Sequence, residues 1–599
     1  MSARFAIGID LGTTNCVLAW VPLEEQSPQA QILPIPQLVD RGTVEARNSL
    51  PSFTYLATDA EAQNGACDLP WCPGADYAVG ELARRQSADN PDRTVGAAKS
   101  WLCHGGVDRN SRILPWQAPE GNPQISPVDA SQRYLEHLVE AWDAEHPDDS
   151  IENQHVVLTV PASFDPAARE LTRAAAIKAG LPESIVLLEE PQAAVYAWLQ
   201  QMGDEWRNIL SAGETLLVCD VGGGTTDLTL VEVSDEDGNL VLQRRAVGDH
   251  LLVGGDNMDA ALAWHAASLF EQKKIQLDPW QSVSLWHSCR TAKEALLAEK
   301  GPRSQTVSVL GRGSRLIGGT VSVKLEREQA AELLINGFLP DAAVSDQPVR
   351  NVQTGFQEMG LPWEQDTGIT RHIADFLTRH GDGSAVRPTW VLFNGGVFRS
   401  DRLRQRLLEV MQGWFDEDAV ALLDGTHDLD NAVALGAAFY GWTRENGDIR
   451  IRGGSPRSWY VGIETSGLAI PGAPRPLRGL CVVPQGMEEG TECDVPSADI
   501  GLIVGQPARF RFFGSTVRTE DEPGALLPSC SSDELVETNS LETELQTEDE
   551  AGAGGASGFS SVPVRFQSRV TELGVLDLWC VSTKDDRRWK LEFDVRESE

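Results

Sequence analysis

Short apolar runs alternate with amphipathic stretches over the first three quarters of this chain. Residues 156–160 form a β-branched run that predicts a strand, and residues 165–179 follow it with the spacing of a helix. Asp165 is suited to the N-cap of that helix, and Gly180 lies just past its expected end. Alternation of this kind predicts α/β layers with partly parallel sheets for residues 1–445.

The pattern changes near residue 456, where helical periodicity fades and short strand-like runs begin. Gly, Pro and charged turns separate these runs, which predicts a β-sandwich or meander and hence an all-β C-terminal domain over residues 458–599. The Gly-rich, polar segment 446–457 is typical of a linker. The expected strands are residues 459–463, 480–483, 500–504, 508–513, 563–570, 575–581 and 590–595.

An acidic stretch interrupts the C-terminal region. Residues 519–550 contain eleven Asp and Glu and no Lys or Arg, and residues 552–560 are rich in Gly and Ser. This composition predicts a disordered acidic loop over about 519–561 inside the β-domain. It fits either an interaction segment or a solvated insertion, and the insertion is the simpler interpretation.

Composition and charge narrow the function classes. The 599 residues are 41% hydrophobic and 23% charged, as in an ordinary globular protein, and the formal net charge is −38. That acidity argues against a general DNA or RNA binder, because such binding depends on Lys and Arg. It permits a small anionic ligand, since backbone N–H groups bind phosphate without positive side chains.

The sequence predicts neither a membrane segment nor a secretory signal. No apolar run approaches the roughly 18 residues of a transmembrane helix, and the N-terminal MSARFAIGID lacks a long apolar core and a cleavage site. The ten Cys are scattered without CxxC or zinc-type spacing. We therefore expect reduced thiols, no membrane association and a cytoplasmic location.

Two glycine-rich turns carry the strongest chemical signal. Residues 5–15 (FAIGIDLGTTN) and 216–227 (LLVCDVGGGTTD) each run from an apolar strand through an Asp and Gly to Thr-Thr. The Gly residues let backbone N–H groups approach phosphate oxygens, and the Thr hydroxyls add donors. Asp10 and Asp220 can position a hydrated Mg²⁺. One such turn is typical of an ordinary hairpin, whereas two matching turns indicate phosphate loops facing each other across a cleft.

A third turn is a weaker signal by itself. In residues 390–399 (WVLFNGGVFR) a strand ends at Gly395 and Gly396, and a helix is expected to start near Asp401. Bare backbone and a helix N-terminus can both approach a nucleoside or phosphate there. Residues 430–440 (DNAVALGAAFY) predict a small-residue helix, for which close helix packing is the simpler interpretation.

This set of motifs, in this order, closely resembles the actin-type ATPase domain, and more narrowly the seventy-kilodalton heat-shock protein (DnaK-type chaperone) family, over residues 4–445. The resemblance implies an α/β actin-like ATPase fold with two lobes around a nucleotide cleft, lobe I at about 1–212 and lobe II at about 213–445. Further matches are residues 77–101 leading to the family's catalytic lysine, 156–169 with its switch proline, 188–194 with its catalytic glutamate, and 253–259 as its ribose-side loop.

The resemblance also implies roles for single residues, with ATP/ADP and Mg²⁺ as cofactors. Asp10 and Asp220 would hold Mg²⁺ through its waters, and Asp10, Thr225 and Asp227 would belong to the catalytic group. Lys99 would bring positive charge to the γ-phosphate, and Glu190 would orient or deprotonate the attacking water. The implied nucleotide-binding residues are Gly12, Thr13, Thr14, Asn15, Gly222, Gly223, Gly224, Gly254, Gly255, Asp256, Lys293, Gly395, Gly396, Arg399 and Asp430.

Without the resemblance, several of these residues have plainer interpretations. Lys99 would be a solvated helix residue and Glu190 a charge at a helix start. Pro161 and Arg169 match the family's relay between nucleotide state and substrate domain. Otherwise they would be a strand end and an exposed helix charge.

The sequence departs from the family where adenine would bind. In the helix that matches the adenine clamp, Lys293 is retained, but Arg290, Glu294 and Leu297 replace the usual residues. Val397 follows the glycines in place of the usual Ser. These changes predict weaker adenine binding or a different hold on the base.

Other departures concern partners. Val186 stands where the family has an Arg beside its J-domain partner, which puts a J-domain co-chaperone in doubt, and residues 446–457 lack the family's apolar linker. The β-domain resembles the family's substrate domain only faintly, through residues 570–581 and 589–595. The chain reaches its last residue without a helical lid, so we expect a lidless domain.

The leading hypothesis is an ATP-binding, weakly hydrolysing chaperone-like protein. Its nucleotide state would bias binding of unfolded polypeptide or a specific protein client by the β-domain, with a nucleotide-exchange factor as a candidate partner. A nucleotide-bound scaffold with little turnover is favoured by the altered adenine helix and opposed by the intact phosphate loops. An actin-fold metabolite kinase would need an Asp poised on an acceptor hydroxyl, and the Lys99 and Glu190 pair counts against it.

Overall fold

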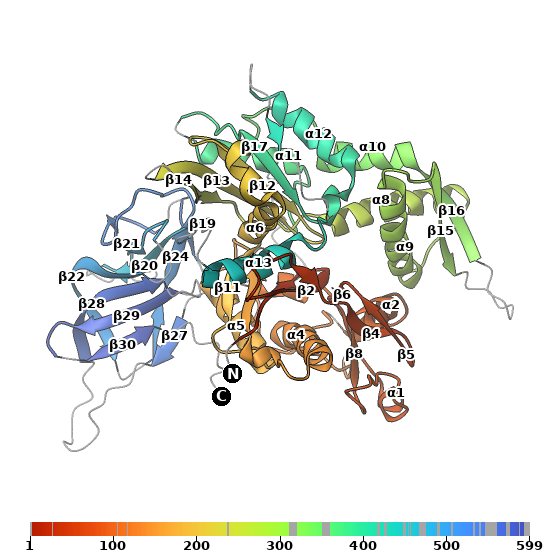
Figure 1. The fold of residues 1–599 in the computed structure, drawn as a ribbon, viewed down its shortest axis with the longest axis horizontal. Helices are drawn as coiled ribbons and strands as arrows, with labels where there is room; N and C mark the ends of the chain where they lie inside the picture. The colour runs from red at the N-terminus through yellow and green to blue at the C-terminus, as the bar shows by residue number, and fades with distance from the viewer. Residues whose placement is uncertain are drawn as a thin grey trace.

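The computed structural model forms two α/β lobes and a strand-rich C-terminal region (Figure 1). It describes residues 3–591 except 27, 105, 117, 237–238, 311–319, 350–359, 382, 416–419, 424–427, 447–450, 453–454, 456, 466–474, 488–490, 505–506, 531–533, 538–540, 545–559, 571–575 and 586. Within these residues, no helix is long and apolar enough to cross a membrane.

The first lobe is built on a six-stranded sheet in the order β11-β10-β1-β2-β3, with β6 paired to β2. β1 lies parallel to β10 and antiparallel to β2. Because side chains alternate along a strand, Ile7 and Ile9 join a cluster with α4 and α5 on one face of the sheet. Ala6 joins a cluster with α6 (Glu190–Met202) and α13 (Ala432–Asn446) on the other face. The elements are β1 (Phe5–Leu11), β2 (Asn15–Pro22), β3 (Gln31–Ile32), β6 (Leu50–Pro51), β10 (His155–Val160), β11 (Val186–Glu189), α4 (Pro127–Glu145) and α5 (Pro166–Lys178).

The second lobe repeats this design with a six-stranded sheet in the order β18-β17-β12-β13-β14-β19. β12 lies antiparallel to β13 and parallel to β17, as β1 does to β2 and β10. The elements are β12 (Thr215–Val221), β13 (Thr226–Glu236), β14 (Asn239–Val247), β17 (Trp390–Asn394), β18 (Ala421–Leu422), β19 (Ile451–Arg452), α8 (Gly255–Gln272), α9 (Pro279–Leu297), α10 (Arg327–Phe338), α11 (Ile369–Arg379) and α12 (Asp401–Gln412).

Smaller elements extend both lobes away from the two sheets (Figure 1). In the first lobe they are β4 (Ile35–Asp40), β5 (Thr43–Arg47), β7 (Thr54–Leu56), β8 (Tyr77–Val79), β9 (Thr94–Val95), α1 (Asp59–Gln63), α2 (Glu81–Asp89) and α3 (Ala98–Leu102). Helix α7 (Trp206–Ile209) leads into the second lobe, where the hairpin β15 (Ser304–Leu310) and β16 (Thr320–Glu326) packs on α9.

Two helices join the lobes into one core. Helices α6 (Glu190–Met202) and α13 (Ala432–Asn446) share a hydrophobic cluster with Val157 of the first sheet and Val218 of the second. Figure 1 shows both helices at the centre of the molecule, between the two sheets. Glu190 therefore begins a helix that is fixed to both lobes.

The C-terminal region contains strands only, among its described residues from 458 to 591. The main sheets have the orders β25-β21-β20-β24-β26 and β22-β28-β29-β30, and they enclose a cluster that includes Val461, Leu480, Val564 and Leu578. The strands are β20 (Ser458–Glu464), β21 (Leu477–Val483), β22 (Glu492–Val504), β23 (Pro507–Phe510), β24 (Phe512–Ser515), β25 (Leu526–Leu527), β26 (Val536–Glu537), β27 (Leu541–Glu544), β28 (Ser560–Val570), β29 (Leu576–Ser582) and β30 (Arg588–Leu591).

Two sequence expectations need correction. Asn446 ends α13, and Ile451–Arg452 pairs in parallel with β14, so part of the expected linker is an edge strand of the second lobe. The first half of the expected disordered loop, up to residue 544, contains β25, β26 and β27, because arginines of the β-domain pair with its acids. The rest of the disordered-loop prediction, residues 545–559, lies outside the described residues.

Candidate functional site

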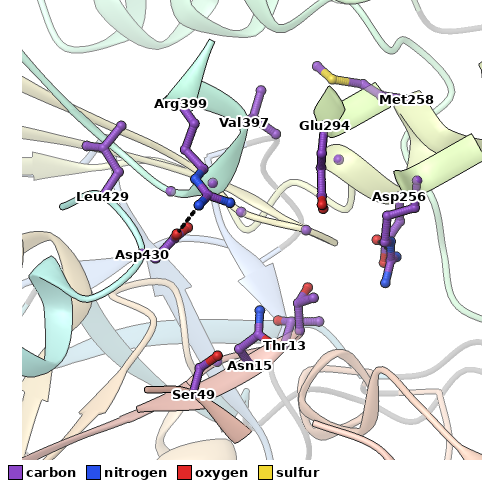
Figure 2. A pocket seen from close by; sticks show the side chains of 18 of the residues that line it. Thr13, Asn15, Ser49, Asp256, Met258, Glu294, Val397, Arg399, Leu429 and Asp430 are labelled. Atoms are coloured by element: carbon purple, nitrogen blue, oxygen red, sulfur yellow. Dashed lines mark hydrogen bonds and ion pairs between the residues drawn. The ribbon is translucent and has the colours of Figure 1, made fainter. Parts of the chain in front are cut away.

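A cavity of about 860 Å³ lies where the glycine turns of the two lobes meet. Thr13 and Asn15 enter it from the first lobe, and Asp256, Glu294 and Arg399 from the second (Figure 2). The predicted residues that line it are Asp10, Gly12, Thr13, Thr14, Asn15, Lys99, Glu190, Asp220, Gly222, Gly223, Thr225, Asp227, Gly255, Asp256, Lys293, Gly395, Gly396, Arg399 and Asp430.

The remaining two predicted residues, Gly224 and Gly254, lie directly behind this lining. A Cβ on Gly254 would come within 2.8 Å of the carbonyl oxygens of Gly222 and Gly223, so that loop packs against the second phosphate-type turn. A Cβ on Gly224 would lie 3.2 Å from Thr13 Cγ2 of the opposite lobe.

The close approach of the two turns requires glycine. A Cβ on Gly223 would lie 1.9 Å from the Thr14 hydroxyl, which belongs to the other lobe. Gly395 has a φ of +86°, and a Cβ there would lie 2.3 Å from the Val221 carbonyl oxygen. These positions leave bare backbone around the cavity, which is the arrangement that binds phosphate oxygens through N–H groups.

Lys99 and Glu190 form a buried ion pair on the cavity wall. Their side chains are only 8% and 12% exposed, although α3 and α6 are far apart in the sequence. The alternative interpretation of Lys99 as a solvated helix residue is therefore wrong, whereas Glu190 does begin α6 and is buried and ion-paired there. Burial would lower the pKa of Lys99, but the carboxylates of Glu190 and Asp10 outweigh this and hold that pKa above its ordinary value.

The carboxyl groups around Lys99 have pKa values that are shifted from their ordinary values. Burial raises the pKa of Glu190 to about 8 and that of Asp220 to about 7, and it also raises the pKa of Asp10. Burial would raise the pKa of Asp227 too, but His250, Ser163 and Lys99 together lower it. Four acids thus crowd around one lysine.

This excess of negative charge fits a divalent cation. Asp10 accepts a hydrogen bond from Thr159 Oγ1 at 3.2 Å, and Asp220 accepts one from Asn394 Nδ2 at 2.7 Å. Asn394 Oδ1 is buried and has no hydrogen-bond partner among the described residues, so it can accept from a metal-bound water. No cluster of three or more His, Cys, Asp or Glu suited to direct metal ligation occurs in the described part of the chain. The residues present therefore suit a hydrated Mg²⁺ rather than a fully protein-ligated ion.

The helix that matches the adenine clamp is tied to the start of α8. Arg290 pairs with Asp256, and its Nε donates to Asp259 Oδ2 at 2.9 Å. Lys293 Nζ lies 2.8 Å from Asp259 Oδ1 and donates to the Gly255 carbonyl oxygen at 2.8 Å. Arg290, which replaces the family's usual residue, thus connects α9 to α8 in this protein. Its partner Asp259 was not identified from the sequence.

Another ion pair, between Arg399 and Asp430, lies across the cavity from Asp256 (Figure 2). Arg399 Nη2 is 2.9 Å from Asp430 Oδ2, and both side chains remain substantially exposed, at 61% and 42%. Arg399 follows the Gly395–Gly396 turn, so its exposed guanidinium lies beside glycine backbone on the cavity wall.

Several buried polar residues beside the candidate site were not singled out from the sequence. Glu189 joins Arg169 Nη2 at 2.7 Å and also Arg244 of β14, so a buried charge triad links the lobes next to Glu190. Arg169, expected otherwise to be an exposed helix charge, is 6% exposed. Ser163 and His250 both contact Asp227. No local motif marks Glu189, Arg244, Ser163 or His250, because each finds its partner only in the folded chain.

The comparisons with known proteins agree with the motifs. Residues 71–347 match the family model described as Hsp70 protein. The chaperone protein HscA homolog of Shewanella sp. (strain MR-7) is 31% identical over 307 residues, which cover 49% of this chain and 42% of that protein. The chaperone protein DnaK of Thermotoga neapolitana is 32% identical over 276 residues, which cover 46% of this chain and 38% of that protein. The matches thus span about two fifths of these relatives' length.

Proposed function

This chain is an Hsp70-family protein, and from that premise we propose that it is an ATP-binding, weakly ATP-hydrolysing chaperone-like protein. In this proposal residues 1–445 form an actin-like ATPase domain of two lobes, and residues 458–599 form an all-β domain that binds unfolded polypeptide or a specific protein client. Nucleotide state biases that binding, a nucleotide-exchange factor resets the cycle, and the protein acts in the cytoplasm.

One observation carries the proposal. The buried Lys99–Glu190 pair lies on the wall of the cavity where bare glycine backbone from both lobes converges. Phosphoryl transfer needs positioning and charge stabilisation more than covalent chemistry, and this arrangement offers both. A buried ion pair is costly to maintain for stability alone, which supports a chemical role.

Each group of residues around the cavity would have its own role in ATP hydrolysis. Backbone N–H groups near Gly12 and Gly222–Gly224, with the hydroxyls of Thr13, Thr14 and Thr225, would hold the phosphates. Mg²⁺, held through its waters by Asp10 and Asp220, would neutralise developing charge on the phosphates. Lys99 would face the transferred phosphoryl group, while Glu190 and Asp227 would orient the attacking water. Arg399 would cover the base.

A scaffold with little turnover remains the second candidate, because one observation favours it. Arg290 and Lys293 are engaged by Asp256 and Asp259. These side chains would have to exchange partners before they could hold a nucleotide, and that exchange would slow each cycle.

Single-turnover hydrolysis of ATP with Mg²⁺ tests the proposal. Wild type, Lys99→Ala and Thr225→Ala are compared with and without an unfolded peptide, and Lys178→Ala serves as a matched lysine control because Lys178 is exposed. We expect Lys99→Ala to lose about 100-fold in rate, Lys178→Ala to match wild type, and peptide to stimulate wild type. Tight nucleotide retention without turnover would instead favour the scaffold.

A further inference from the structure

Asp227 is held at a junction of both lobes. Ser163 lies in the turn between β10 and α5 of the first lobe, and His250 follows β14 of the second. Ser163 Oγ donates to Asp227 Oδ1 at 2.7 Å, and His250 Nδ1 lies 3.2 Å from the same oxygen. Ser163 and Asp227 are 8% and 4% exposed, and the His250 side chain is 14% exposed.

The hydrogens of this junction can be assigned. A carboxylate only accepts, so the single hydroxyl hydrogen of Ser163 is donated to Asp227. Ser163 Oγ therefore accepts from His250 Nδ1, which lies 2.8 Å away, and Nδ1 must carry a hydrogen. Ser163 donates to Oδ1 of Asp227, and the single Nδ1 hydrogen of His250 is shared between Ser163 Oγ and the same Oδ1, which leaves Oδ2 for a ligand or water in the cavity that Asp227 lines.

The backbone keeps the three groups in place. Thr226 and Leu251 exchange backbone hydrogen bonds at 2.9 and 3.3 Å, which places His250 directly beside Asp227. The Phe164 ring packs edge-on against the imidazole at 6.3 Å.

The β-domain reaches the same junction from outside. Arg457, which leads into β20, donates from Nη2 to the Ser163 carbonyl oxygen at 3.2 Å. Its guanidinium also lies 5.6 Å from the ring of Trp459, the second residue of β20. A shift of the β-domain would therefore act on the turn that contains Ser163.

We propose that Ser163 and His250 are positioning residues that fix the Asp227 carboxylate for ATP hydrolysis, and that this junction tightens only when both lobes and the β-domain are correctly docked. The proposal rests on the proposed ATPase function. Neither residue touches the cavity, so they act through Asp227 and not on the nucleotide. Because they belong to different lobes, opening of the cleft breaks the junction and misplaces the catalytic carboxylate.

Paired substitutions test this in the full-length chain. Ser163→Ala removes the donor and Ser163→Thr restores it. His250→Asn places an amide donor near the position of Nδ1, whereas His250→Gln and His250→Leu do not. In single-turnover hydrolysis with Mg·ATP, we expect Ser163→Ala and His250→Leu to lower the maximal rate about tenfold with nucleotide affinity unchanged. Ser163→Thr and His250→Asn should recover most of that loss, and His250→Gln should not.

Hydrogen exchange supplies a readout that needs no turnover. His250→Leu should accelerate amide exchange in both 160–165 and 248–252, which lie on opposite lobes, and His250→Asn should not. Equal rates for wild type, Ser163→Ala and His250→Leu would overturn the inference, as would a loss that neither Ser163→Thr nor His250→Asn rescues. A wild-type chain without turnover would overturn the proposed function instead.

Discussion

Gly436 lies where α13 packs against α6, and this contact leaves no room for a side chain. A Cβ at this position would lie 1.8 Å from the Ala193 carbonyl oxygen, 2.7 Å from its carbon and 2.8 Å from the Ala197 nitrogen. All three atoms belong to the backbone of α6, so no side chain can rotate away. The helices would have to separate by more than about 1 Å to accept one methyl group.

The expected cost follows from two opposing effects. Overpacking of this kind costs about 1–3 kcal/mol, and backbone contacts place Gly436→Ala at the upper end. Replacing Gly by Ala inside a helix returns about 1 kcal/mol. We expect a net loss of about 2 kcal/mol, which lowers the melting temperature by about 2 °C, because unfolding of the roughly 445 residues of the two lobes has an entropy of about 0.9 kcal/mol/K. Since α6 begins at Glu190, turnover should also fall.

Gly337 provides the matched control. It lies in α10, and a Cβ there would meet no atom within 4 Å. Gly337→Ala should therefore stabilise the protein by about 0.5–1 kcal/mol. Differential scanning calorimetry measures both variants under the same conditions. If Gly436→Ala melts at or above the wild-type temperature, then α6 and α13 do not interlock at this glycine.

Two further predictions concern buried charges. Burial lowers the pKa of His137 to about 4, so the folded chain binds fewer protons than the unfolded chain between pH 4 and about 6.5, and stability falls as the pH drops through that range. His137→Gln keeps a donor for the Pro36 carbonyl oxygen but cannot be protonated, so the free energy of unfolding should fall by about 3 kcal/mol less between pH 7 and pH 4 than in wild type. Urea titrations at the two pH values measure this difference. An unchanged pH dependence would contradict the lowered pKa of His137. Glu189→Gln should cost about 3 kcal/mol because Arg169 and Arg244 keep their buried charges, and a melting temperature equal to wild type would count against the triad.

The elements with local signals could be predicted from the sequence. Asp165 accepts from the Ala168 N–H at 2.6 Å as an N-cap, and Gly180 has a φ of +97° just past α5. The strands before the two glycine turns, β1 and β12, lie where the apolar runs indicate. Capping, turn and strand signals act over a few residues, so one stretch of sequence contains all the information they need.

Partnerships between distant residues could not be predicted in this way. Arg244 meets Glu189 across 55 positions, and Arg290 meets Asp259 across 31. Nothing in the local pattern around Arg290 separates a nucleotide contact from an ion pair, because both need one charged side chain on one helix face. Only the resemblance to the family identified Lys99 and Glu190, and their roles in turnover stay predictions.

In the C-terminal region, composition predicts disorder where the structure has strands. An acidic run without Lys or Arg predicts disorder, yet Arg518 Nε lies 2.7 Å from Asp521 Oδ2 and Arg518 Nη1 lies 2.7 Å from Glu534 Oε2. Arg518, which neutralises these two acids, lies outside the acidic run 519–550. The composition of the run alone therefore wrongly predicts disorder. In the same way, the Gly-rich composition of residues 446–457 does not predict the short strand β19, because β19 forms by pairing with the edge of β14.

The measurement that tests the account most directly is a double-mutant cycle on Lys99 and Glu190. Single-turnover ATP hydrolysis is recorded with Mg²⁺ for wild type, Lys99→Ala, Glu190→Gln and the double variant. If the two residues act as one unit, each single change lowers the rate by about 100-fold, and the double variant is hardly slower than either. Rates that multiply independently, or single variants that hydrolyse ATP as fast as wild type, would contradict the claim that this buried pair is the centre of an ATPase site.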